Sequence, residues 1–86
     1  MEDNNQLNDI AAKIEALLFV SSGLVSVNQL AKALGTSESE IEAHLSALEN
    51  HYKSAGHGLR LMRIKSRVQM TTAPEISKTL ETFLEL

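Results

Sequence analysis

Cysteine is absent from the 86 residues, which excludes a disulfide scaffold, a cysteine zinc site and a thiol nucleophile. Tryptophan is absent too, and aromatic residues make up only 3% of the chain. The longest apolar run, Ala16–Val20, is far shorter than the roughly 20 residues of a membrane span. Segment 1–5 is acidic and polar, unlike the basic and then apolar start of a signal peptide. The absence of cysteine fits a reducing cytosol. The short apolar runs give no indication of a membrane-spanning segment.

Charge is distributed unevenly along the chain, although the net charge is only −3. Residues 1–50 carry two lysines against eight acids, and residues 75–86 carry one lysine against three acids. Between them, residues 51–74 hold five basic side chains and no acid. The pattern predicts a polarised surface that meets a partner or a phosphate backbone.

Three helices are predicted in the first two thirds of the chain. The first spans about 7–21 with an apolar stripe through Ile10 and Ile14, and Gly23 is placed to end it as a left-handed cap. Capping boxes at 26–29 and 37–40 open the second and third helices, which Gly35 and Gly56 follow. The stripes of the first and third helices place Leu17 and Leu48 in the core.

Two strands and a last helix follow. Residues 59–64 and 68–71 read as strands, and the turn between them lacks Gly and Asn, so a loop looser than a two-residue turn is expected. A third capping box, 72–75, with Pro74 in the first turn, opens the final helix. Helix–helix–helix–hairpin is the order of a winged helix, and segment 24–26 is suited to be the third strand.

The expected fold class is therefore α+β and mostly helical: a winged helix, built as a three-helix bundle plus a β-hairpin wing, with a C-terminal helix. Residues 1–6 are expected to be a flexible tail and 7–73 the winged-helix domain. Residues 74–86 are expected to form the last helix, which leads to a second domain missing from this sequence.

Direct DNA reading by the third helix is not favoured. Glu40, Glu42 and Glu49 flank its polar side, and carboxylates oppose a phosphate backbone. The wing retains four candidates for weak phosphate contacts: Arg60, Arg63, Lys65 and Arg67. Charged wings also occur simply because edge strands need protection from aggregation, and that interpretation is favoured over DNA contact.

No catalytic, metal or cofactor site is predicted. His44 and His51 lie two helical turns apart, too far to ligate one ion together. No serine, histidine and acid form a recognisable motif, and no glycine pattern suggests a phosphate loop. We therefore expect no enzyme, no cofactor, no small-molecule substrate and no membrane partner.

The first helix is apolar on a second side. Its main stripe is separated on a helical wheel from a second apolar set. Four residues make up this set: Ala12, Ala16, Phe19 and Val20. Periodicity leaves open whether the same domain or a second protein chain covers them.

The sequence resembles the segregation and condensation protein B family over residues 10–84. The resemblance rests on Ile14-Glu15-Ala16-Leu17-Leu18-Phe19, Leu34-Gly35, His57-Gly58-Leu59 and Val68-Gln69-Met70, with the spacing between them. Departures from the family pattern at Val25, His57 and Ser66-Arg67 concern the wing tip and not the fold.

The resemblance implies a non-enzymatic, cytoplasmic and nucleoid-associated subunit of the bacterial chromosome condensation and segregation complex. Such proteins form homodimers through the first domain and bind the kleisin, segregation and condensation protein A, mainly through the second domain. They meet the structural-maintenance-of-chromosomes ATPase indirectly. The alternatives are a winged-helix transcriptional regulator that binds DNA directly and an adaptor winged helix of another assembly.

Overall fold

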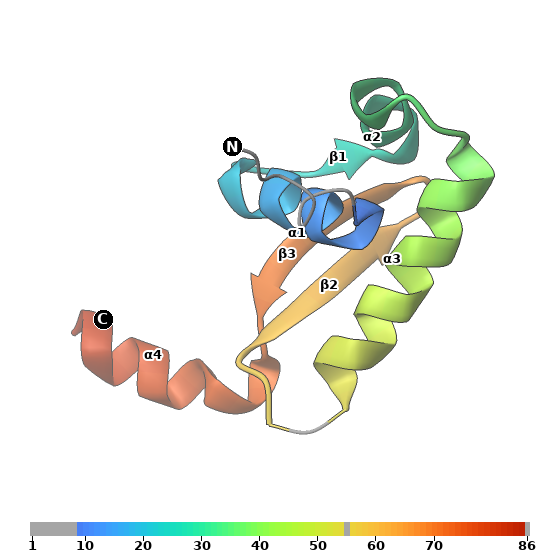
Figure 1. Ribbon diagram of the computed structural model, residues 1–86. Helices are drawn as coiled ribbons and strands as arrows, with labels where there is room; N and C mark the ends of the chain where they lie inside the picture. Colours follow the sequence, from blue (N-terminus) through green and yellow to red (C-terminus); the bar gives the residue numbers. More distant parts are fainter. Residues whose placement is uncertain (1–8, 55, 86) are drawn as a thin grey trace, which may run out of the picture.

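The computed structural model describes residues 9–54 and 56–85, so the expected tail 1–6 lies outside the described residues. Helices and strands follow one another in the order expected of a winged helix (Figure 1). Their bounds are α1 Ile10–Val20, β1 Val25–Ser26, α2 Val27–Leu34, α3 Glu38–Lys53, β2 Leu59–Ile64, β3 Arg67–Thr72, the 3-10 turn η2 Pro74–Ile76, and α4 Ser77–Leu84. Within the described residues, no helix is both long and apolar enough to cross a membrane.

Local capping explains where the helices begin. Asp9 caps α1 by accepting from the Ala11 N–H at 2.9 Å. The predicted box at α2 is confirmed, because Ser26 accepts from the Gln29 N–H and Gln29 accepts from the Ser26 N–H, both at 3.0 Å. At α3, Ser37 accepts from the Glu40 N–H, which is only half of the predicted box.

The ends of α1 and α3 differ from the prediction. Ser21 ends α1 by donating its hydroxyl to the Leu17 carbonyl at 2.7 Å. Gly23 is therefore not needed as a left-handed cap and does not have a positive φ. Helix α3 ends at Lys53, capped by Ser54, whereas Gly56 with φ +68° turns the chain further on. Gly35 does cap α2 in the left-handed conformation, as predicted.

The sheet has three antiparallel strands in the order β1-β3-β2. The short β1 pairs Val25 with Val68, which confirms the expected third strand. Ile64 pairs with Arg67, so only two residues connect β2 to β3 and the expected looser loop is wrong. Lys65 adopts φ +55° in this turn, and the turn is held from outside by the Val27 N–H, which donates to the Ser66 carbonyl at 2.8 Å. The strand ladder and this bond compensate the modest cost of a left-handed lysine.

The predicted capping box at 72–75 is also wrong. Thr72 is the last residue of β3 and pairs with Leu59, so its side chain does not cap a helix. The Ala73 N–H donates to the Gly58 carbonyl at 2.8 Å, and Pro74 then starts the 3-10 turn η2. Helix α4 follows and leads away from the body of the domain (Figure 1).

One core joins the three N-terminal helices to the inner face of the sheet. Its buried members are Ile14, Leu18, Val27, Leu30, Ala31, Ile41, Leu45, Tyr52, Leu61 and Val68. Leu17 and Leu48, predicted in the core, are half-buried and pack at its margin. The fold class predicted from the sequence is confirmed, while the fully buried leucines of the two long helices are Leu18 and Leu45.

Candidate protein-interaction surface

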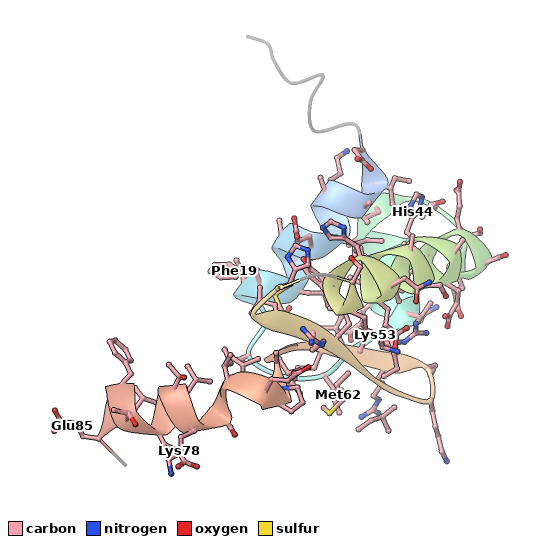
Figure 2. The ribbon with its side chains drawn as sticks, turned by 90° about the horizontal axis from the view of Figure 1, so that it is seen from below. Phe19, His44, Lys53, Met62, Lys78 and Glu85 are labelled. Atoms are coloured by element: carbon pink, nitrogen blue, oxygen red, sulfur yellow. The ribbon has the colours of Figure 1, made fainter. Side chains whose placement is uncertain are left out.

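Helix α1 has two different apolar sides. Ile14 and Leu18 are buried in the core, whereas Phe19 and Val20 are each 75% exposed. Figure 2 shows Phe19 projecting outward from the body of the domain. The second apolar side of α1 is thus left uncovered by the described residues of the same domain, including α4.

An apolar groove of about 340 Å³ lies beside this side of α1. Three of the four predicted interface residues line it, Ala12, Ala16 and Phe19, whereas Val20 does not. Glu15 of α1 also lines the groove. The remaining lining residues, Tyr52, Leu59 and Met70, come from α3, β2 and β3.

The residues of the sheet that line the groove were not predicted from the sequence. Leu59 and Leu61 are two residues apart on β2, and Val68 and Met70 are two apart on β3, so each pair shares one face. Leu61 and Val68 are buried, while Leu59 is 37% exposed and Met70 half-buried. The face of the sheet that closes the core therefore continues into the groove. The period-two spacing of these residues in the sequence was the signal that they share this face.

Tyr52 anchors the floor of the groove. Its ring is buried, and its hydroxyl donates a hydrogen bond to the Glu15 carboxylate of α1. Burial, together with the bond to Glu15 and its negative charge, raises the pKa of Tyr52 from 10.0 to about 12. This bond joins the end of α3 to α1, between two residues that both line the groove.

Tyr52 is the single tyrosine, so its ionisation can be followed directly by ultraviolet absorbance. We expect a midpoint near 12 in the folded chain and near 10 after denaturation. Because the folded pKa is the higher one, the stabilisation is complete below pH 10 and is lost as the pH rises towards 12. The unfolding free energy should fall by roughly 2–3 kcal/mol across that range, at about 1.36 kcal/mol per pKa unit.

The control for this titration is Tyr52→Phe. Lysines also titrate in the same range, so only the difference between the two proteins isolates the phenol. A folded-state midpoint near 10 would contradict a buried hydroxyl bound to Glu15.

The histidines do not gather into a metal site. His51 and His57 have ring centroids 4.6 Å apart and pack around Tyr52, whereas His44 lies elsewhere on α3 (Figure 2). Among residues 9–54 and 56–85, no three metal-ligating side chains come together.

The wing divides the four predicted phosphate contacts into two pairs. Arg60 donates to Glu75 at 3.0 Å and to backbone carbonyls, including that of His57 at 2.9 Å. Arg63 reaches back to α3, where it pairs with Glu42 and lies 3.7 Å from Glu49.

Lys65 and Arg67 remain exposed at the tip of the wing. Two of the four cations are therefore already engaged by carboxylates of the same domain. One of them, Arg63, also neutralises part of the acidic side of α3.

Duplex DNA is expected to bind weakly, without sequence preference, and to dissociate as salt rises. About two free cations at the wing tip release only about two counterions, so the logarithmic salt slope should be near −2. Fluorescence anisotropy with labelled duplexes of unrelated sequence, from 50 to 200 mM salt, measures both properties. Tight binding of one sequence at physiological salt would favour the regulator interpretation.

The three helices, the two-stranded wing and the short strand beside it define a winged-helix domain. A family model described as "Segregation and condensation complex subunit ScpB" matches residues 12–86, and the chain belongs to this family. Segregation and condensation protein B of Moorella thermoacetica is 32% identical over 77 residues, covering 90% of this chain and 40% of that relative. The protein of the same name from Syntrophotalea carbinolica is 37% identical over 67 residues, covering 78% and 34%. The chain thus spans less than half the length of these relatives.

Solved structures agree on the fold. ScpB from Mycobacterium tuberculosis superimposes with a TM-score of 0.85 at 21% identity, covering 99% of this chain and 52% of that one. A dimer of an ScpB N-terminal domain complexed with ScpA peptide gives a TM-score of 0.79 at 27% identity, covering 92% of this chain and 99% of that one. This chain therefore aligns with nearly the whole length of that N-terminal domain.

Proposed function

We propose that this chain is a non-enzymatic subunit of a bacterial chromosome condensation and segregation complex, and that the domain acts as a self-association module. The observation that carries the proposal is the uncovered apolar side of α1, with Phe19 and Val20 each 75% exposed. The dimeric ScpB N-terminal domain supports it, since this chain matches 99% of that domain. A two-fold dimer buries such a patch on both subunits.

An ScpA-type kleisin is the proposed second partner, with the ATPase of the complex reached indirectly through it. That ScpA binds mainly to a second domain remains a prediction. The relative crystallised with ScpA peptide consists of an N-terminal domain, which supports a share of that contact on this domain as well. The proposed location is the cytoplasm, in association with the nucleoid.

The competing role, direct DNA binding as a transcriptional regulator, is less well supported. Of the four wing cations, Arg60 and Arg63 are held in ion pairs with Glu75 and Glu42, and α3 carries the acidic Glu38 and Glu40 in its first turn. An interaction module needs neither a basic recognition helix nor a free wing.

Sedimentation equilibrium of the 86-residue chain tests the proposal. We expect a concentration-dependent mass near twice 9.4 kDa and saturable binding of a peptide from the ScpA protein of the same genome. A monomer at all concentrations, with no peptide binding, would contradict the self-association role.

A further inference from the structure

Helix α4 carries an apolar stripe without a partner. Phe83 is 80% exposed and Leu84 is 57% exposed, Leu80 is half-buried, and no residue of α4 is buried. Spacing of three and four residues places these side chains on one face of the helix. A short helix with such a face gains most of its stability from packing that face against another surface.

The base of α4 is held in a direction away from the groove on α1. Glu75 pairs with Arg60 at 3.0 Å, and the Ala73 N–H is bonded to the Gly58 carbonyl. The half-buried Ile76 lies against Gly58, with its Cδ1 3.7 Å from where a Cβ at that residue would be. These contacts hold the residues just before α4, and no residue of α4 in the same chain lines the groove.

Both features lie on the same side of the molecule. In Figure 1, α4 leaves the domain on the left, the side where α1 ends, and Figure 2, which keeps left and right, places Phe19 on that same side. Two chains related by a two-fold axis can therefore exchange helices, each chain offering one groove and one α4. Such a pairing is self-complementary and closes as a dimer.

We propose that α4 of one copy docks in the groove of a second copy, with Phe83 inserted between α1 and the end of the sheet. The receiving residues are Ala12, Ala16, Phe19, Tyr52, Leu59 and Met70. Small alanines on α1 allow close approach of the incoming helix, and the exposed Phe19 lines the same groove. This inference rests on the proposed dimer and specifies how the dimer is built.

The exposed phenylalanines supply a substantial part of the apolar area that a stable pair needs. An aromatic side chain buries about 150–250 Å², so covering the exposed parts of Phe19 and Phe83 removes roughly 300 Å² per protomer. The pair then buries about 600 Å² from these two residues, against about 1,600 Å² for a standard interface. Val20, Leu84 and the partly exposed Leu59 add further apolar area, and the polar rim adds the rest.

Cysteine pairing between two different chains tests the docking directly, because the native chain has no cysteine. One chain carries Ala16→Cys in the groove, and the other carries Thr79→Cys, one turn before Phe83 on α4. Mixing them under mild oxidation should give a mixed disulfide dimer at least tenfold faster than the control pair of Thr79→Cys with Lys32→Cys on α2. Equal rates for the two pairs would overturn the docking.

A second variant tests the energetic role of α4. Phe83→Asp should raise the dimer dissociation constant by about 10²–10³-fold, because each dimer contains the contact twice. Thr82→Asp adds the same charge on another side of the helix and should change the constant less than threefold. Circular dichroism should show both variants folded, since both positions are exposed.

The outcomes separate this inference from the proposed function. A wild-type dimer that forms no selective mixed disulfide and is unaffected by Phe83→Asp overturns the docking of α4 and leaves the self-association role intact. A wild-type chain that stays monomeric contradicts the self-association role and, with it, the docking.

Discussion

Leu45→Ala is expected to lower the unfolding free energy by about 2–5 kcal/mol. Leu45 is 0% exposed and lies in the middle of α3, where the helix packs into the common core. Truncation removes buried methyl groups and leaves a cavity that the surrounding side chains fill only in part. A domain of this size has a total unfolding free energy of about 5–15 kcal/mol, so the expected loss is a large fraction of that total.

Urea denaturation followed by circular dichroism measures this effect, with Leu48→Ala as the matched control on the same helix. Leu48 is half-buried at the margin of the core, so its truncation should cost clearly less. Equal losses for the two variants would mean that α3 packs with a different register from the one observed.

The contrast between Leu45 and Leu48 shows what periodicity can predict. The stripe Ile41, Leu45, Leu48 and Tyr52 was correctly identified as the inner side of α3, because apolar spacing reports direction around a helix. Which member of a stripe lies deepest depends on the neighbouring elements. Leu45 is fully buried in the core that α3 shares with α1, α2 and the sheet, and this packing is a tertiary property.

The connections were harder to predict than the elements they join. Lys65 adopts a positive φ because the strand ladder and the Ser66–Val27 bond hold the turn, not because the local sequence prefers it. Thr72 is a residue type that commonly caps helices, but it pairs with Leu59 in the sheet instead. In both cases long-range pairing overrides a local preference.

Only part of the candidate site could be predicted from the sequence. The exposed side of α1 follows from periodicity, yet the rest of the groove needs the placement of Tyr52, Leu59 and Met70 from three other elements. The wing arginines show the same limit. Their charge is evident from composition, but the pairing of Arg63 with Glu42, 21 residues away, exists only in the folded chain.

Phe19→Asp is expected to weaken the dimer by about three orders of magnitude while leaving a folded domain. At 75% exposure the side chain contributes little to the core, so the monomer should tolerate a carboxylate there. An aromatic anchor of an interface costs about 2 kcal/mol or more on truncation, and a two-fold dimer loses it twice. About 4 kcal/mol corresponds to roughly a thousandfold change in the dissociation constant.

Sedimentation velocity alongside circular dichroism measures both parts of this expectation. Ala33→Asp on α2 is the control, because it adds the same charge at an exposed helical position outside the groove. If Phe19→Asp unfolds the domain, Phe19 supports the core in a way its exposure does not show. If the variant stays folded and still dimerises as tightly as the wild type, the interface does not involve α1, and the wing strands with their exposed Met62 and Ile64 become the surface to examine.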